Sequence, residues 1–386
     1  MPIVQGIEGA RFSGVVLTIG NFDGVHRGHR ALLDKGLEVA KAAGTGLVVM
    51  TFEPHPSAIL TPDRVPPTLT PLHEKLRLIT QAGASSIVLV ESRREFFQIS
   101  AEEFIRDIIV DRFHPIAMVE GDNFRFGQHR MGDVEMLQAA GRVNGFDVHV
   151  VEPVRVALGG HPDTVISSSL VRHLIGSGNL DRATQCLGRP YALFGTVRRG
   201  AGRGRKLGFP TANLAVENQL VPAEGVYAGV AYVSAGEGRG VRDEGRGARG
   251  EGGGDDGMGG HEDKETRGQG DKGTQGQGDK GAGGKGDSAM AECAEGGVAH
   301  LFRGGGHEDR LAFPAAISIG RTPTFKPQEV LVEAYLLDFQ GDLYDRPLKL
   351  ELLDWIREQQ RFPTVEALRE QIERDVAHVR EILPKP

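Results

Sequence analysis

The chain has 386 residues, of which 25% are charged, and a formal net charge of -7 at pH 7. This length suffices for two or three domains with separate cores, and the acidic balance argues against a protein that coats nucleic acid or an anionic membrane. The first residues lack the pattern of a signal peptide, and no stretch is apolar for the roughly 20 residues of a membrane-spanning helix. Two cysteines support neither a disulfide framework nor a thiolate metal site. We expect a cytoplasmic protein, monomeric or weakly self-associating, that binds small molecules and neither nucleic acid nor membrane.

The first half of the chain alternates apolar runs with amphipathic stretches. Strand patterns cover 15–20, 46–52, 86–90, 116–121 and 148–154, and helix patterns cover 29–44, 72–83 and 101–113. Gly44 and Gly83 follow two of these helices, where a C-terminal cap needs a residue that tolerates positive φ. This order predicts an α/β domain, a parallel sheet with helices on both faces, whose ligands bind at the carboxyl ends of the strands.

A turn with two histidines follows the first of these strands. Its sequence is NFDGVHRGH, residues 21–29, and Gly24 and Gly28 would let its backbone approach a ligand closely. His26 and His29 could donate ring N–H groups to a polyphosphate at the start of the helix, or they could be structural. A zinc site is not supported, because Asp23 and His55 add no known metal-ligand spacing.

Three further polar segments follow predicted strands or precede a predicted helix. They are TFEPHP at 51–56, EGDNFRFGQHRMGD at 120–133 and ISSSLVR at 166–172. Each also has a purely structural explanation, since a proline-rich segment can form a rigid turn, phenylalanines can pack in a core, and serines 167–169 can cap a helix.

In combination, the four segments resemble the N-terminal module of the prokaryotic bifunctional riboflavin kinase and FMN adenylyltransferase family, the FAD synthetases. The resemblance implies a Rossmann-like nucleotidyltransferase domain over residues 1–186, in which the phosphate of FMN attacks the α-phosphate of ATP and pyrophosphate leaves. It implies His26, His29 and Arg172 as catalytic residues. The implied nucleotide- and flavin-binding residues are Gly20, Phe22, Asp23, Gly24, Gly28, His55, Asp122, Asn123 and Ser168.

Composition changes sharply between residues 236 and 310. Roughly a third of this segment is glycine and most of the remainder is polar, so it cannot bury enough apolar surface to offset the entropy of ordering. We expect a disordered, glycine-rich insertion that a surface loop tolerates at small cost. Deleting residues 240–306 is therefore expected to leave the kinase activity of the surrounding domain nearly intact.

From residue 187 onward, short alternating strands separated by turns flank this insertion and predict a small antiparallel barrel with a closing helix. The segment GTVRRGAGRGRKLGFPTANL, residues 195–214, resembles the phosphate-binding region of riboflavin kinases and is not a Walker A loop. Without that resemblance, its PTAN element could be a plain turn. The resemblance implies a six-stranded riboflavin kinase-like barrel over residues 187–386. The residues implied for ATP are Gly200, Gly202, Gly204, Lys206, Pro210, Thr211 and Asn213, with Thr211 and Asn213 also holding Mg²⁺.

The last motif lies in VEAYLLDFQGDLY, residues 332–344. Strand alternation places Glu333 opposite Val332 and Ala334, so Glu333 is either an exposed strand residue or a carboxylate aimed into a site. The resemblance implies that Glu333 is the base that accepts the proton of the ribityl 5′-hydroxyl of riboflavin. Asp345 stands where the family usually has glycine, a change that could alter the turn without touching the chemistry.

These features predict an enzyme that converts riboflavin to FMN and FMN to FAD, with ATP as co-substrate and Mg²⁺ as cofactor. Two alternatives stay open. The chain could retain one of the two activities, or it could be a regulator that binds a flavin or nucleotide without converting it.

Overall fold

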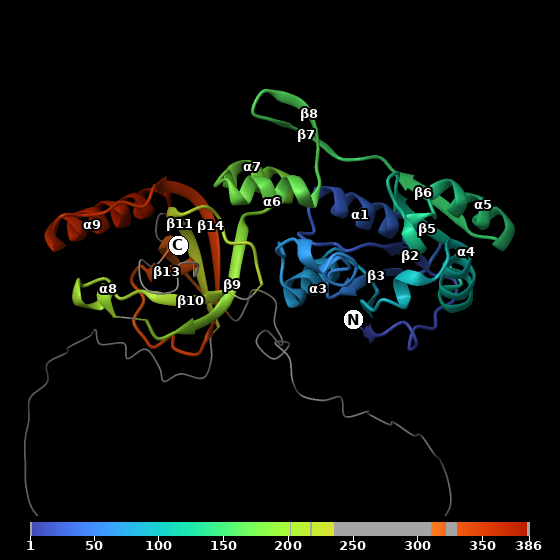
Figure 1. Cartoon of the computed structure of the whole chain (residues 1–386), viewed down its shortest axis with the longest axis horizontal. Coiled ribbons are helices and arrows are strands. Elements are labelled where there is room, and N and C mark those ends of the chain that lie inside the picture. The colour runs from blue at the N-terminus through green and yellow to red at the C-terminus, as the bar shows by residue number, and fades with distance from the viewer. Residues whose placement is uncertain (1, 201, 217, 235–309, 322–329, 384–386) are drawn as a thin grey trace, which may run out of the picture. The chain divides into compact units, whose positions relative to one another are not determined.

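Two sheets of different construction organise the chain in the computed structural model (Figure 1). The structure describes residues 2–200, 202–216, 218–234, 310–321 and 330–383. The first sheet is entirely parallel and has the strand order β1-β4-β3-β2-β5-β6. Its strands are β1 (Ile3–Gln5), β2 (Val16–Ile19), β3 (Leu47–Glu53), β4 (Ser86–Glu91), β5 (Ala117–Gly121) and β6 (Asp147–Val151).

Helices cover both faces of this sheet, as the alternating pattern predicts. Val16 and Val49 pack on one side with α1 (Arg27–Ala42) and α3 (Leu72–Gln81), while Leu17 and Met50 pack on the other with the helical segment 101–113 and α5 (Val134–Asn144). A parallel strand that is buried on both faces reads as a continuous apolar run, which is why these strands stand out in the sequence. The expected helix at 101–113 is a short α4 (Ala101–Glu103) followed by a π-helix, η3 (Phe104–Phe113).

The order of the strands places a topological switch point in the middle of the sheet, between β2 and β5. The chain passes from β2 to β3 on one side and later reaches β5 on the other, so β2 and β5 flank the topological switch point, where ligands bind in open α/β sheets. Backbone pairing between β2 and β5 covers only Val16 with Ala117 and Leu17 with Met118. The two strands therefore part before their carboxyl ends.

Shorter elements lie between the strands of the parallel sheet and after its last strand. They are α2 (Ser57–Leu60), the 3₁₀ turns η1 (Pro62–Arg64), η2 (Phe96–Gln98) and η4 (Gln128–Arg130), and the hairpin β7 (Arg155–Leu158) and β8 (His161–Val165). Two helices come next, α6 (Ser168–Gly176) and α7 (Leu180–Leu187). The sequence analysis named neither α5 nor α7 as a helix, and it also missed β1, α2 and the hairpin, whose runs of three to five residues are too short to show a period.

The second sheet is a closed barrel of six antiparallel strands, which confirms the predicted architecture. Its order is β10-β13-β12-β11-β14-β9. The strands are β9 (Tyr191–Arg198), β10 (Ala212–Val216), β11 (Gly225–Ser234), β12 (Arg310–Arg321), β13 (Val330–Leu336) and β14 (Pro347–Arg357), with α8 (Arg203–Lys206) between β9 and β10. The closing helix α9 (Val365–Ile382) contacts β11 and β12 and buries Val379 against Ala228 and Leu337.

The predicted insertion joins two barrel strands. Strands β11 and β12 pair without interruption from Gly225 with Ile319 to Ser234 with Arg310. The expected disorder of 236–310 lies outside the described residues, apart from the backbone of Arg310, which begins β12. In the described part of the chain, no helix combines the length and apolar character needed to cross a membrane.

The apolar core of the barrel also includes residues of α6 and α7. Helices α6 and α7 pack on each other, and α7 also contacts β9 and β14. Val171 and Leu174 of α6 thus belong to the same apolar cluster as Leu193 and Leu352 of the barrel. All described residues form one compact unit.

Candidate active sites

A cavity of about 910 Å³ lies at the carboxyl ends of β2 and β5. This volume is at the upper end of the range for small-molecule sites and suits a nucleotide together with a second ligand. Eight of the predicted residues line it: Gly20, Phe22, His26, Gly28, His29, Asp122, Asn123 and Ser168. Four other predicted residues, Asp23, Gly24, His55 and Arg172, lie outside its lining.

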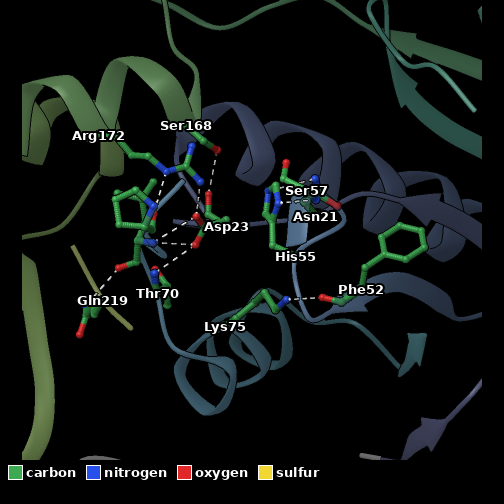
Figure 2. A network of polar contacts seen from close by, with 12 residues as sticks. Asn21, Asp23, Phe52, His55, Ser57, Thr70, Lys75, Ser168, Arg172 and Gln219 are labelled. Carbon is green, nitrogen blue, oxygen red and sulfur yellow. Dashed lines mark hydrogen bonds and ion pairs between the residues drawn. The ribbon is translucent and has the colours of Figure 1, made fainter. Parts of the chain in front are cut away.

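The turn that carries the two histidines has a strained backbone. Phe22 and Val25 adopt the left-handed region, with φ of 50° and 39°, which is rare for an aromatic and for a β-branched residue. Asp23 lies between them and holds the turn (Figure 2). Its carboxylate accepts hydrogen bonds from the Leu69 amide, at 3.0 and 3.1 Å, and from the Thr70 amide, at 3.1 Å.

Arg172 completes the environment of Asp23. Its guanidinium donates to the Asp23 carboxylate at 2.6 Å and to the Pro67 carbonyl at 2.9 Å, and the Ser168 hydroxyl donates to the Asp23 carbonyl at 3.0 Å. Both residues come from the first turns of α6, for which the Ser167 side chain is the N-cap. The polar side of α6 is thereby fixed to the histidine turn.

Gly24 and Gly28 serve the turn in different ways. Gly24 has φ of +87°, and a Cβ there would lie 2.9 Å from Leu69, so its lack of a side chain permits packing behind the turn. Gly28 lines the cavity, and a Cβ there would lie 3.1 Å from the His26 ring. Only the second glycine is in a position to let the backbone approach a ligand.

His26 and His29 form a stacked pair at the start of α1. Their ring centroids are 3.7 Å apart, and His26 Nδ1 accepts the backbone N–H of His29 at 3.3 Å as the helix N-cap. Burial, with the charges of Arg189 and Arg172, lowers the pKa of His26 to about 4, and burial also lowers the pKa of His29. Both rings are therefore neutral at pH 7. Because Nδ1 of His26 is an acceptor, its proton is on Nε2.

His55 lies beside the turn rather than in the cavity lining. Its Nδ1 accepts the Ser57 amide at 3.2 Å, and its Nε2 is 3.4 Å from the Asn21 side-chain nitrogen (Figure 2). Burial lowers the pKa of His55. These contacts position the loop after β3. A role of His55 in ligand binding stays a prediction.

Two polar residues at this site had no role predicted from the sequence: Glu120, which begins the segment 120–133, and Arg189. Glu120 lines the floor of the cavity at the end of β5. Arg189 donates to the carbonyls of Gly24, at 2.6 Å, and Val25, at 3.2 Å, and burial lowers its pKa to about 10. A charged residue at the end of an apolar strand could have revealed Glu120, whereas no local pattern singles out Arg189.

The second group of predicted residues lies on the outer face of the barrel. Asn213 of β10 is the direct cross-strand partner of Glu333 on β13, and Glu333 also pairs with Ser318 on β12. Val332 and Ala334 are 1% and 0% exposed in the barrel core, so Glu333 faces outward and is half-buried. The expected alternation is confirmed.

Glycines bring the preceding loop against this group. A Cβ on Gly200 would lie 2.2 Å from the Asn213 side chain, and one on Gly204 would lie 2.3 Å from the Phe209 carbonyl and 3.1 Å from Thr211 Oγ1. Thr211 and Asn213 are two residues apart, so their side chains share one side of an extended segment. Lys206 is the last residue of α8. Gly202, Lys206 and Pro210, which lie in the same loop region, are exposed to solvent.

The hydroxyl of Thr211 and the amide oxygen of Asn213 are hard oxygen donors, which fit Mg²⁺ when phosphates and water complete its shell. Within the described residues, no cluster of three histidine, cysteine, aspartate or glutamate side chains could hold a metal ion alone. The turn after Tyr344 keeps a left-handed residue: Asp345 has φ of 58° and pairs with Arg198 at 2.9 Å.

Comparison with known proteins finds two families, each of which matches a part of the chain that contains one of the two sites. Residues 9–169 match the FAD synthetase family, and residues 187–383 match the riboflavin kinase family. The bifunctional riboflavin kinase/FMN adenylyltransferase of Escherichia coli (strain K12) is 33% identical over 391 residues, covering 100% of both chains. The enzyme of the same name from Pseudomonas fluorescens is 30% identical and covers 98% of this chain and 97% of its own.

A solved structure shares the fold. It is described as a macrolide-efflux protein from Streptococcus pneumoniae, with a TM-score of 0.70, 23% identity and 98% coverage of both chains. At this identity the likeness concerns the fold alone. The full-length matches to curated enzymes and the two family matches show that the chain belongs to the family of bifunctional riboflavin kinase/FMN adenylyltransferases.

Proposed function

We propose that this chain phosphorylates riboflavin to FMN and adenylylates FMN to FAD, using ATP in both steps. The observation that carries the proposal is that each family match contains one of the two polar sites: residues 9–169 contain the histidine turn, and residues 187–383 contain Asn213 and Glu333. We assign FAD formation to residues 1–186 and riboflavin phosphorylation to residues 187–386. A cytoplasmic location and a monomeric or weakly self-associating state stay predictions from the sequence.

FAD formation requires positioning and charge stabilisation rather than a nucleophile on the enzyme. A phosphate oxygen of FMN attacks the α-phosphorus of ATP, a P–O bond forms, and the bond to pyrophosphate breaks. His26 and His29 would donate neutral ring N–H groups to the phosphates at the N-terminus of α1, where the helix dipole favours negative charge. Asp23 would maintain the turn in its strained form. Direct contact between Arg172 and a phosphate stays a prediction, because its described contacts are with Asp23 and Pro67.

Riboflavin phosphorylation needs a base and phosphate neutralisation. Glu333 would accept the proton of the ribityl 5′-hydroxyl as that oxygen attacks the γ-phosphorus of ATP and ADP leaves. Thr211 and Asn213 would hold Mg²⁺, which when bound would offset the phosphate charge. Gly200 and Gly204 keep the loop close enough to place backbone amides along the phosphates.

Product analysis tests the two activities separately. We would incubate the purified chain with riboflavin and ATP, and in parallel with FMN and ATP, and separate the products by chromatography. The proposal predicts FMN with ADP in the first reaction and FAD with pyrophosphate in the second. A single product would mean that one site is inactive. Flavin binding without either product would favour a regulator and contradict the proposal.

A further inference from the structure

Glu120 is a buried carboxyl group at the floor of the larger cavity, and neither proposed reaction uses it. It is 1% exposed and lines the cavity at the end of β5. Its Oε1 accepts the backbone N–H of Ile19 at 2.8 Å. Backbone pairing between β2 and β5 ends at Leu17 and Met118, so the side chain of Glu120 takes over where the two main chains part.

The surroundings of Glu120 favour its neutral form. Burial raises the pKa of Glu120 well above its usual range, and the hydrogen bond from Ile19 opposes this in part. Among the described residues, the Ile19 amide is the hydrogen-bond donor to this carboxyl, and no cation pairs with it. Other titratable groups line the same cavity: His26 and His29 from α1, Arg94 after β4, Asp122, Arg125, His129 and Arg130 after β5, and Glu152 after β6.

We propose that Glu120 is a positioning residue of the adenylyltransferase site. It acts as an uncharged side chain that fixes the Ile19–Gly20 backbone leading into the histidine turn, and it keeps negative charge away from the floor of a cavity that receives a triphosphate. An ionised carboxylate in this poorly solvated position would repel the phosphates and would be left without a cation. The inference rests on the proposed FAD-forming activity.

Two substitutions separate the hydrogen bond from the charge. Glu120→Gln keeps an acceptor for the Ile19 amide and cannot ionise, whereas Glu120→Val removes the acceptor. Glu135→Gln, on the exposed side of α5, is the matched control for loss of a negative charge. FAD formation is measured between pH 6 and pH 10, and riboflavin phosphorylation by the same chain reports that the protein remains folded.

At pH 7 we expect Glu120→Gln and Glu135→Gln to keep kcat/KM for FAD formation within about 3-fold of the wild type. Glu120→Val should lose at least ~10-fold, because a buried amide is left without its partner. As pH rises through the raised pKa of Glu120, the wild type should lose FAD formation while Glu120→Gln retains it. A purely structural role would leave the two pH profiles alike.

Three results would overturn the inference: wild-type activity in Glu120→Val, equal losses in Glu120→Gln and Glu120→Val, or an alkaline loss in Glu120→Gln that matches the wild type. Hydrogen exchange of the Ile19 amide gives a readout that does not depend on turnover. Protection should persist in Glu120→Gln and fall in Glu120→Val, and equal protection would contradict the inference. If the wild type forms no FAD, the proposed function fails, and the exchange of Ile19 still decides whether Glu120 fixes this backbone.

Discussion

The cavity at the end of the parallel sheet and the outer face of the barrel differ most in how far their polar groups are removed from water. His26, Asp23 and Glu120 are each 5% exposed or less, whereas Asn213 and Glu333 are half-buried on the outer face of the barrel. The buried site has shifted pKa values and a charge pair that spans the chain from Asp23 to Arg172. We infer that the first site depends on packing and neutralised charge, and the second on the chemistry of single side chains.

The barrel site should therefore show the largest loss from one isosteric change. Glu333→Gln removes the proposed base while preserving shape, and general-base catalysis contributes ~10²–10⁴-fold, so we expect riboflavin phosphorylation to fall by ~10³-fold. FAD formation from supplied FMN, assayed in the same sample, should be unchanged. Retention of more than a tenth of the kinase rate would show that Glu333 is not the base.

The buried site should respond to loss of its charge pair by losing stability. Arg172→Met leaves the Asp23 carboxylate buried without a cation, and we expect the free energy of unfolding to fall by about 3 kcal/mol. Urea unfolding measures this change. The exposed pair Arg155 and Asp163 is the control, because Arg155→Met should cost less than about 1 kcal/mol. Equal losses in the two variants would mean that the Asp23 pair is no better than a surface contact.

His26 offers a third comparison, because it caps α1 and its ring N–H is a proposed donor to the phosphates. His26→Asn preserves a good N-cap but removes the imidazole N–H, and loss of one such donor reduces turnover by ~10²-fold. FAD formation should fall by that factor while the kinase rate is unchanged. An unaltered rate of FAD formation would exclude the ring from the reaction.

The same variant has a pH signature. The pKa of His26 is about 4 in the folded chain and 6.5 as its ordinary value, so the unfolded chain binds more protons between these two pH values. The stability that His26 contributes is thus present above pH 6.5 and lost as the pH falls toward 4. We expect the Tm of the wild type to fall more steeply over this range than that of His26→Asn. Parallel curves would show that the ring is not buried in its neutral form.

The smallest effect is expected from removal of the segment between β11 and β12. Ser234 and Arg310 are direct cross-strand partners, so replacing residues 235–309 by Asn-Gly would join β11 to β12 through a two-residue hairpin turn. Because both ends already lie side by side, we expect both activities to stay within about 2-fold of the wild type. A kinase loss of ~10-fold or more, with the Tm unchanged, would assign the removed residues a part in catalysis.

Local patterns in the sequence predicted most of the architecture and the near neighbours within each site. The strand and helix periods identified β2, α1 and β13, and the register of the barrel brings Asn213 to Glu333, which the motifs had indicated separately. The partners of Asp23 could not be predicted, because Leu69 and Arg172 are far away in sequence and reach it only through tertiary packing. Arg189 is a similar case, since its hydrogen bonds go to two backbone carbonyls that no side-chain pattern reveals.

The two sides of α6 carry a consequence for protein engineering. Ser168 and Arg172 on its polar side hold the histidine turn, while Val171 and Leu174 belong to the apolar cluster of the barrel. A chimera that takes the barrel of a relative from residue 187 onward would place a foreign surface against α7 and the apolar cluster that α6 shares with the barrel. A barrel from a relative must therefore be chosen for its fit to α6 and α7, and the two parts of the chain cannot be exchanged independently.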